Sequence, residues 1–275
     1  MSIPLAMPSR RLSTGLGAIA ALALTACDEP TVNAEPHSGN FAQPAPNAER
    51  PQLGLMTSLP LYWPTGMDFG DIAQGNGETP WQRDLMEQQF RLTPLDTLTP
   101  IPALSSDEPD TDPLAGLSHL AVIQPRGLSA ADNVALDQWV RDGGRLLLVL
   151  DPMLTSEYDM PLGDPRRPVG SALIPPVVKR WGLEVSFDED QPLERQVPLG
   201  ADVLNVSLAG DIQAAEGSTP DCEIVAEAVV ARCSVEQGSV TLLADADVFE
   251  HEYETEAEAA ETLFPLARFM RFAFP

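Results

Sequence analysis

The sequence predicts an α/β fold in which helices cover both faces of a mostly parallel β-sheet. Strand-like and helix-like segments alternate along most of the chain. Residues 145–150, Arg-Leu-Leu-Leu-Val-Leu, are almost continuously apolar, as in a central parallel strand that is buried on both faces. Residues 117–150 form a strand–helix–strand unit, and a parallel crossover of this kind is right-handed. The 275 residues are enough to bury a substantial core without metal or disulfide support.

The first predicted elements follow one another along the chain. Residues 53–59 form a short apolar strand, and residues 81–90 carry apolar side chains at helical spacing, with Thr79 as the N-cap. Residues 92–98 form a second strand, which Pro94 confines to an edge of the sheet. The folded domain therefore begins with a strand, a helix and an edge strand.

The central unit has the clearest boundaries. Residues 117–123 form a buried strand, after which Ser129 caps a helix that runs to Asp142. One face of this helix is expected to hold its apolar positions, Val134, Leu136, Trp139 and Val140. Residues 145–150 then form the next strand.

The C-terminal half adds two helices, two strands and a hairpin. We expect helices over 171–181 and 256–274, strands over 183–187 and 203–208, and a hairpin with strands 224–235 and 239–244. This late hairpin adds antiparallel strands to the otherwise parallel pattern.

The N-terminal residues have the pattern of a bacterial export signal. Arg10 and Arg11 precede the apolar segment 12–26, which is too short to span a bilayer. The segment ends in Leu-Thr-Ala-Cys, which resembles a lipobox. This resemblance implies that Cys27 is lipidated and that residues 1–26 are removed by signal peptidase II. Ordinary signal cleavage that leaves Cys27 as a free thiol is the alternative.

The next residues predict where the protein is held. Asp28 resembles an inner-membrane retention signal of lipoproteins, so the expected location is the periplasmic side of the bacterial cell envelope, lipid-anchored, with the inner membrane favoured. Residues 27–51 contain five prolines and form a disordered tether. A flexible tether of this length reaches about 25–30 Å. Residues 52–275 form the α/β domain.

The charge balance excludes one class of partner. The chain has 41 acidic against 16 Lys and Arg residues, for a net charge of −25. Nucleic-acid binding needs basic surface, so no nucleic-acid partner is expected. The sequence has no Walker loop or Gly-x-Gly-x-x-Gly motif, and no cofactor is expected.

Residues 120–152 carry a distinctive series of short motifs. A strand ends in a Pro loop, Leu-Ser opens a helix, and Leu-Asp-Gln-Trp lies within it. Gly-Gly ends the helix, and an apolar strand closes on Asp-Pro. The residues in question are Pro125, Leu128-Ser129, Leu136-Asp137-Gln138-Trp139, Gly143-Gly144 and Asp151-Pro152. This series resembles the GldG-type auxiliary proteins of ABC transport systems. The similarity continues at residues 179–185 and 244–249.

The resemblance has implications for fold, function and partners. It implies a fold similar to class I glutamine amidotransferases, which is a flavodoxin-like three-layer sandwich. It also implies an accessory or binding domain of an ABC-type transport system, with the ATPase or permease subunits as partners. Such a domain would meet the membrane through its lipid anchor.

No catalytic residues are assigned. Amidotransferase-like enzymes place a nucleophile on a tight strand-to-helix turn. The matching turn, residues 123–127, contains neither Cys nor Ser, and Ser129 is explained by helix capping. The protein is therefore expected not to be an enzyme.

Several polar residues follow predicted strands of the sheet. Open α/β sheets bind ligands outside the carboxyl ends of their strands. The positions that define this ligand or partner edge are Gln124, Pro125, Arg126, Asp151 and Asp245.

An alternative function uses residues near the last strand. Asp245, Asp247 and His251 could serve a divergent envelope hydrolase or a metal-binding protein. Carboxylates at a strand end are more often solvated or capping groups, so no metal site is assigned. His119 is interpreted as a core or strand-end histidine.

Two cysteines flank a predicted turn. Ten residues separate Cys222 from Cys233, and an exported compartment permits their oxidation. A redox or metal pair would be expected to show Cys-x-x-Cys spacing. We therefore predict a structural disulfide.

Overall fold

The computed structural model describes residues 50–65, 70, 79–250 and 256–275, and the side chains of 256–264 are not among the described parts. The predicted signal segment 1–26, Cys27 and nearly all of the tether lie outside the described residues, as does His251. Within the described part, no helix combines the length and apolar character needed to cross a membrane.

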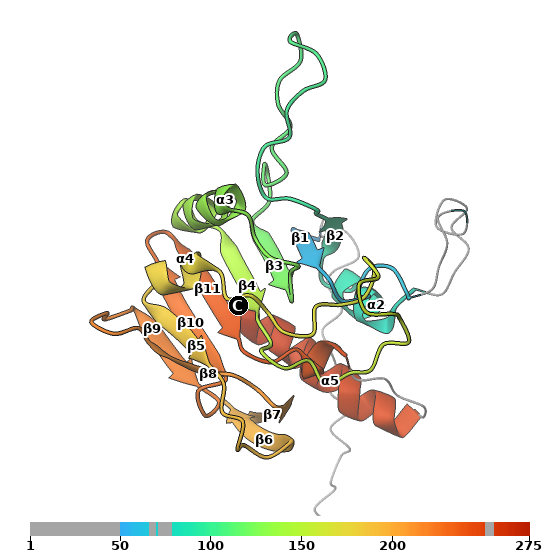
Figure 1. Ribbon diagram of the computed structural model, residues 1–275, viewed down its shortest axis with the longest axis vertical. Coiled ribbons are helices and arrows are strands. Elements are labelled where there is room, and N and C mark those ends of the chain that lie inside the picture. Colours follow the sequence, from blue (N-terminus) through green and yellow to red (C-terminus); the bar gives the residue numbers. More distant parts are fainter. Residues whose placement is uncertain (1–49, 66–69, 71–78, 251–255) are drawn as a thin grey trace, which may run out of the picture. The chain divides into compact units, whose positions relative to one another are not determined.

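A mixed sheet forms the centre of the fold (Figure 1). The spatial order of its seven described strands is β2 (Arg91–Pro94), β1 (Gln52–Thr57), β3 (His119–Ile123), β4 (Arg145–Val149), β11 (Gly238–Leu243), β10 (Val230–Val235) and β9 (Cys222–Val225). Every pairing from β2 to β11 is parallel, and the last two pairings are antiparallel. The predicted mostly parallel sheet with a late hairpin is confirmed.

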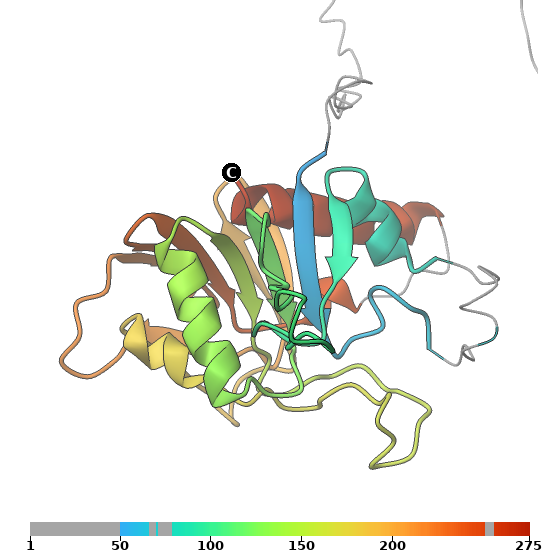
Figure 2. The same cartoon turned by 90° about the horizontal axis from the view of Figure 1, so that it is seen from above.

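Helices cover both faces of this sheet (Figure 2). Helices α3 (Ala130–Arg141) and α4 (Pro176–Arg180) lie on one face, and α2 (Trp81–Glu87) and α5 (Glu256–Ala273) lie on the other. Strand β4 shows how one strand packs against the helices on both faces. Leu147 and Val149 join the hydrophobic cluster that contains residues of α2 and α5, while Leu146 and Leu148 join the cluster that contains residues of α3 and α4. Its almost continuous apolar sequence therefore serves two cores.

Helix α3 begins where its sequence predicts. The Ser129 hydroxyl accepts a hydrogen bond from the Asp132 amide at 3.0 Å, and the Asp132 carboxylate accepts one from the Ser129 amide at 3.1 Å. This reciprocal capping box satisfies two backbone donors of the first turn. The expected apolar face needs one correction, because the side chain of Val134 is 70% exposed.

Two predicted helix starts are wrong for reasons of local chemistry. The N-cap of α2 is Pro80, without a side-chain capping bond, and not Thr79. Helix α4 begins only at Pro176, whereas we predict a helix from residue 171. A residue before proline is pushed out of the helical region, so Pro175 and Pro176 exclude a helix on their N-terminal side.

The strands after α4 also differ from the prediction. β5 (Leu183–Ser186) does not join the main sheet but pairs antiparallel with β8 (Asp211–Ala214). β6 (Glu194–Leu199) and β7 (Asp202–Ser207) form a separate hairpin. The predicted strand 224–235 is split into β9 and β10, because Ala226, Glu227 and Ala228 adopt positive φ angles and form a turn.

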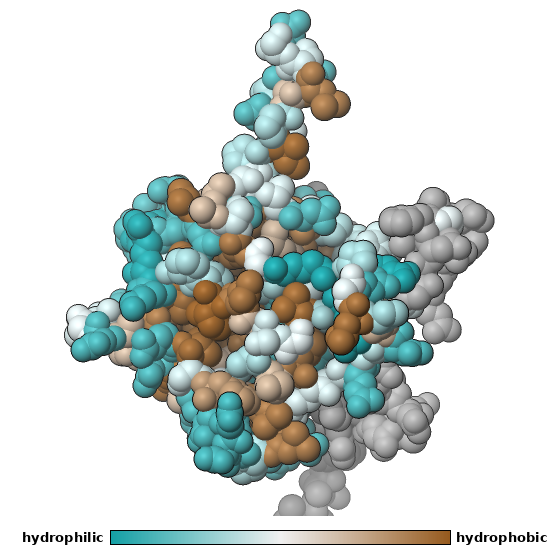
Figure 3. All heavy atoms as spheres, viewed as in Figure 1, coloured by the Kyte–Doolittle hydropathy of each residue, from teal (hydrophilic) through white to brown (hydrophobic). Residues whose placement is uncertain are grey.

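The face of the molecule drawn in Figure 3 has hydrophilic side chains around its margin and hydrophobic ones nearer its centre. Hydrophobic side chains gather in the area where Figure 1 draws α4 and β10. The segment between β4 and α4 contributes exposed apolar side chains, namely Met153, Leu162, Leu173 and Ile174. This segment therefore offers apolar surface beside the carboxyl ends of the parallel strands.

Candidate functional site

The carboxyl ends of four neighbouring strands bring polar residues together. Ser58 follows β1, Gln124 follows β3, Asp151 follows β4 and Asp245 follows β11. The exposed fractions of Gln124, Asp151 and Asp245 are 0%, 2% and 1%. Three of the residues predicted for the ligand or partner edge thus lie at that edge, but beneath the surface.

Gln124 links the ends of three segments. Its side-chain Nε2 donates to the carbonyl oxygens of Asp151, at 3.0 Å, and Val169, at 2.9 Å. Its Oε1 accepts from the Asp151 amide at 2.9 Å. Its own carbonyl accepts from the Ser58 hydroxyl at 2.5 Å. Every polar group of the Gln124 side chain is used inside the protein.

The backbone of Gln124 is also informative. Its φ angle is +44°, which is uncommon for a residue other than glycine. A strained turn between a strand and a helix is where amidotransferase-like and hydrolase-like enzymes expose a nucleophile. Here that turn carries a buried glutamine whose amide holds neighbouring backbone, so the position has a structural role.

Asp151 and Asp245 also hold backbone in place. The Asp151 carboxylate accepts from the amides of Met153, at 2.8 Å, and Ala246, at 3.0 Å. The Asp245 carboxylate accepts from the amides of Ser207, at 2.7 Å, and Asp247, at 2.6 Å. Each of the four carboxylate oxygens therefore has a backbone donor, and together they fasten the ends of β4, β7 and β11.

Burial governs the acidity of this group. Desolvation raises the pKa of Asp151 to about 6, against the lowering effect of its two backbone hydrogen bonds. Desolvation and the neighbouring charge of Asp151 raise the pKa of Asp245 well above its usual value. Desolvation also raises the pKa of Glu250 to about 7. These acids share one region, and no described Lys or Arg side chain forms an ion pair with Asp151, Asp245 or Glu250.

The metal alternative finds little support in this geometry. Among the described residues, no three His, Cys, Asp or Glu side chains form a group that could hold a metal ion. Both carboxylate oxygens of Asp245 already accept backbone hydrogen bonds. Asp247 lies next to this region, and His251 falls outside the described residues.

A cavity of about 540 Å³ lies beside the sheet edge. Its walls come from the segment after β1, from α2, from the connection between β4 and α4, and from the residues after β11. The residues that line this cavity include Gln82, Tyr158, Met160, Arg166, Phe249 and Glu250. Sequence reasoning places Glu250 beside the acids of the last strand but does not find its partner, because Tyr158 lies 92 residues away in an irregular connection.

The solvent-accessible part of the predicted edge is small. Pro125 is buried like Gln124, and Arg126 is exposed. A side chain on Gly127 would lie 3.5 Å from Leu173, which is 68% exposed. The surface that a partner can reach at this edge is therefore Arg126 together with the apolar side chains that precede α4.

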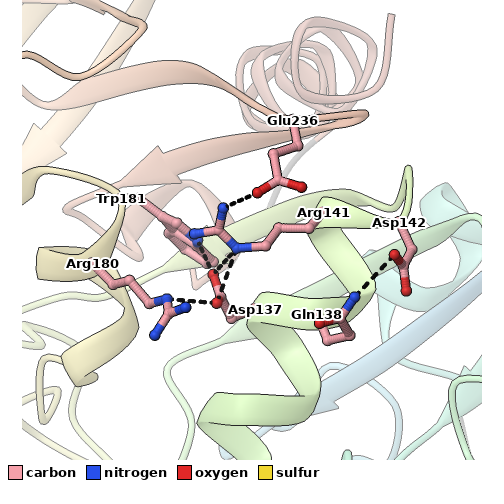
Figure 4. A network of polar contacts seen from close by, with 7 residues as sticks. All are labelled: Asp137, Gln138, Arg141, Asp142, Arg180, Trp181 and Glu236. Carbon is pink, nitrogen blue, oxygen red and sulfur yellow. Dashed lines mark hydrogen bonds and ion pairs between the residues drawn. The ribbon is translucent and has the colours of Figure 1, made fainter.

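Another buried acid has a different environment (Figure 4). The Asp137 carboxylate accepts from the Trp181 indole at 2.9 Å and from the Arg141 guanidinium at 3.0 Å, and Arg180 lies 2.7 Å away. Arg141 also contacts Glu236 in the turn between β10 and β11. This network joins α3 to α4 and to the hairpin. Asp137 and Trp181, which belong to the motifs of the family resemblance, therefore have a structural role.

The predicted disulfide is present in the structure. Cys222 on β9 and Cys233 on β10 are bonded and lie directly opposite each other, with their Cα atoms 4.0 Å apart. The bond closes the turn that contains Glu227 and Ala228, and it fastens the edge strand β9 to the sheet.

Fold and site together define an α/β domain whose sheet edge holds buried Gln124, Asp151 and Asp245, and whose strand-to-helix turn, residues 123–127, contains neither Cys nor Ser. A family model described as "ABC-type uncharacterized transport system" matches residues 50–189. This match covers 140 of the 275 residues, from 50 to 189 inclusive. The chain therefore belongs to this family of auxiliary components of ABC-type transport systems.

Solved structures provide more distant comparisons. An exo-β-1,4-mannosidase from Opitutaceae bacterium strain TAV5 aligns with a TM-score of 0.47 and 11% identity over 81% of this chain and 36% of that enzyme. This chain thus spans about a third of the length of that glycosidase. A ThuA-like protein from Bacteroides uniformis aligns with a TM-score of 0.37 and 13% identity over 82% of this chain and 93% of that one.

A cytoplasmic protein from Salmonella typhimurium aligns with a TM-score of 0.38 and 9% identity over 70% of this chain and 84% of that one. No curated protein sequence matches the chain. At these scores and identities, none of the activities in these names is carried over to this chain.

Proposed function

We propose that this protein is a non-catalytic, lipid-anchored accessory or binding domain of an ABC-type transport system in the bacterial cell envelope. The observation that carries the proposal is the family match over residues 50–189, which includes the first strands of the sheet and the members of the Asp137 network on α3 and α4. The domain is proposed to have the flavodoxin-like three-layer architecture of class I glutamine amidotransferases.

The structural role of Gln124 supports the non-catalytic part. A nucleophile on this turn would have to be accessible to a substrate. Gln124 is instead fully buried, and its amide bonds three backbone groups. A hydrolase or metal site at Asp245, Asp247 and His251 is not favoured, because backbone amides occupy the Asp245 carboxylate.

The anchoring part rests on the N-terminal sequence. Lipidation of Cys27 would attach the chain to the membrane, and Asp28 favours the inner membrane. Several acyl chains give stable attachment where one does not. The residues between Cys27 and β1 would let the domain reach a transporter from the periplasmic side.

The proposed partners are the ATPase or permease subunits of the transporter. Arg126 and the exposed Leu173 are the accessible groups at the sheet edge, and we propose that they contribute to the contact. An exposed charge beside apolar side chains is a composition that suits a protein interface.

Crosslinking in intact cells, followed by purification and mass spectrometry, tests this proposal. The native chain is expected to enrich ABC ATPase or permease subunits reproducibly. A Cys27→Ala variant should lose both its membrane attachment and this enrichment. Enrichment should also fall in an Arg126→Glu variant that remains membrane-bound. A membrane-bound native chain that never enriches such subunits would contradict the transporter role.

A further inference from the structure

The connection between β4 and α4 forms one wall of the cavity beside the sheet edge. Residues 155–167 of this connection contain no helix or strand, and Figure 2 draws the connection as an irregular loop that extends from the body of the domain. More than half of the residues that line the cavity belong to this segment, namely Ser156, Glu157, Tyr158, Asp159, Met160 and Arg166. A movement of the segment would therefore change access to the cavity.

Both ends of the segment are fixed at the sheet edge. The Leu154 amide donates to the Gly170 carbonyl at 3.0 Å, so the two ends meet in a narrow neck. Beside this neck, the Val169 carbonyl accepts from Nε2 of Gln124 at 2.9 Å, and the Val169 amide donates to the Ser58 hydroxyl at 3.1 Å. A surface loop whose ends lie close together in this way is an Ω-loop, and such loops are frequently functional.

The part of the loop beyond the neck has little buried surface. None of the residues 155–167 is buried, whereas Pro168, which follows them, is buried. Leu162 is 91% exposed. Segments with few buried apolar contacts open at a small cost in free energy, and the lids of binding sites are drawn from such segments.

Internal hydrogen bonds hold this segment together as one unit. The Arg167 guanidinium donates to the carbonyl oxygens of Tyr158, at 2.7 Å, and Met160, at 2.6 Å. The Arg166 guanidinium pairs with the Asp164 carboxylate, with 2.8 Å between Nη2 and Oδ2. Because these bonds lie within the segment, they can persist while it moves relative to the rest of the domain.

Two hydroxyl groups fasten the segment to the residues after β11. The Tyr158 hydroxyl donates to Oε1 of Glu250, and the Ser156 hydroxyl also forms a hydrogen bond with the Glu250 carboxylate. Hydrogen bonds to a charged acceptor are stronger than those between neutral groups, so both bonds oppose a movement of the segment away from Glu250. We name the contact of Ser156 and Tyr158 with Glu250 the latch.

From this arrangement we infer that residues 155–167 form a hinged flap, which turns about the neck at Leu154 and Gly170 and opens the cavity when the latch is released. Hinges of this kind need only a few loop residues that absorb the change in backbone angles. In the open state Arg167 still holds the flap together. This conformational change is independent of the proposed transporter contact, which uses residues outside the flap.

Distances between pairs of spin labels, measured by pulsed electron paramagnetic resonance, test the flap in the purified full chain. Cys27→Ala leaves no other free thiol, because Cys222 and Cys233 are bonded to each other. The first pair of labels is attached through Leu162→Cys in the flap and Val134→Cys on α3, two positions that are 91% and 70% exposed.

A control pair shows whether a change is confined to the flap. It combines Val134→Cys with Leu193→Cys, an exposed position between β5 and β6. Circular dichroism of each labelled chain confirms that it is folded. Only the pair that includes residue 162 is expected to respond to the latch.

The latch is removed by combining Tyr158→Phe with Ser156→Ala, which deletes both hydroxyl donors. The ratio of open to closed flap should rise at least about fivefold, seen as a second, distinct distance between residues 134 and 162. Tyr62→Phe is the matched control, because it removes a tyrosine hydroxyl but keeps the ring that lies against the Arg83 guanidinium. It should leave both label pairs unchanged.

Three results would overturn the proposal. One is a distance between residues 134 and 162 that is the same with and without the latch. Another is an equal change in the control pair, which would indicate a general loosening of the domain. The third is a broad, continuous distribution of the 134–162 distance while the latch is intact. It would mean that the segment has no closed state, whether or not the latch variant folds.

Discussion

Two regions of this protein bury carboxylates in opposite ways. Beside α3, Asp137 is surrounded by Arg141, Arg180 and the Trp181 indole. Desolvation alone would raise its pKa, but the hydrogen bonds from Arg141 and Trp181 and the nearby positive charges lower it overall. At the sheet edge, Asp151 and Glu250 form no ion pair with a cation in the described part of the chain, and burial raises their pKa to about 6 and about 7.

The difference separates an acid that is charged at neutral pH from acids that change their protonation state near neutral pH. Arg141 and Arg180 balance the charge of Asp137 within the protein. The role of Asp137 is therefore structural: it helps to join α3 to α4 and to the hairpin. Glu250, in contrast, forms no ion pair with a described Lys or Arg side chain, and it lines a cavity. Burial therefore does not by itself determine the pKa of a carboxylate, because hydrogen bonds and nearby positive charges can outweigh it.

The largest expected effect comes from breaking the Asp137 network. Asp137→Ala leaves the Trp181 indole without its acceptor and Arg141 with Glu236 as its remaining partner, and it should lower the free energy of unfolding by about 3 kcal/mol. Urea denaturation measures this change. Asp142→Asn, at the C-cap of the same helix, alters an exposed side chain that accepts a hydrogen bond from Gln138 and should cost less than about 0.5 kcal/mol. Equal losses in the two variants would remove the contrast drawn above.

The sheet-edge acids predict an unusual dependence of stability on pH. The folded state raises the pKa values of Asp151 and Glu250 above their unfolded values, which are near about 4. The folded state therefore binds more protons between these values, and the stability gained by protonation is lost as pH rises through 6 and 7. We expect the free energy of unfolding to fall by about 3 kcal/mol between about pH 5 and 8.

At lower pH, the acids with lowered pKa values have the opposite effect on the free energy of unfolding. The pKa values of Asp132 and Asp137 are lowered, so their contribution is present above their unfolded values and is lost as pH falls through the folded values. Chemical denaturation across the pH range should therefore give a maximum near about pH 4, close to the unfolded pKa values of these acids. A stability that rises steadily from pH 5 to 8 would contradict the assignment of the sheet-edge acids.

The Glu250→Gln substitution tests how much the buried charge of Glu250 changes stability, because it replaces a single oxygen of the carboxylate. At pH 8 the variant avoids a buried charge and should be more stable than the wild type by about 2 kcal/mol. At pH 5, where Glu250 is protonated, the two should differ by less than about 0.5 kcal/mol. Thermal unfolding at both pH values measures this, and a variant that is less stable at pH 8 would show that the charge is compensated.

The smallest effect concerns the capping box of α3. Ser129→Ala removes the acceptor of the Asp132 amide and should cost about 1 kcal/mol. The Asp132 pKa should rise in the variant, because a hydrogen bond from Ser129 lowers it in the wild type. NMR titration of the Asp132 carboxyl carbon follows this change. An unchanged Asp132 pKa would mean that its bonds to Leu98 and Thr97 suffice.

Some features were predictable because they depend on neighbours along the chain. The N-cap Ser129 pairs with Asp132, the third residue after it in the chain. The edge position of β2 follows from Pro94, which lacks an amide hydrogen. The buried strand β4 was predictable because a strand covered on both faces must be apolar throughout. The family resemblance over residues 120–152 likewise used a local series of motifs.

Other features could not be read from local pattern. Val134 fits an apolar face by its residue type, but the packing of α3 leaves it exposed. The pairing of β5 with β8, away from the main sheet, is a choice between strands with similar patterns. Gln124, Asp151 and Asp245, three of the five residues predicted for the sheet edge, lie near one another in the structure, but the sequence pattern gave no sign that they are buried.

By itself, the sequence determined the α/β class, the two-sided core of β4, the start of α3 and the acidic character of the chain. These follow from residue type and short-range spacing. The tertiary structure decided which carboxylates have cations beside them, and it alone placed Tyr158 against Glu250. Electrostatic environment depends on distances between residues that are remote in the chain, and only folding sets those distances.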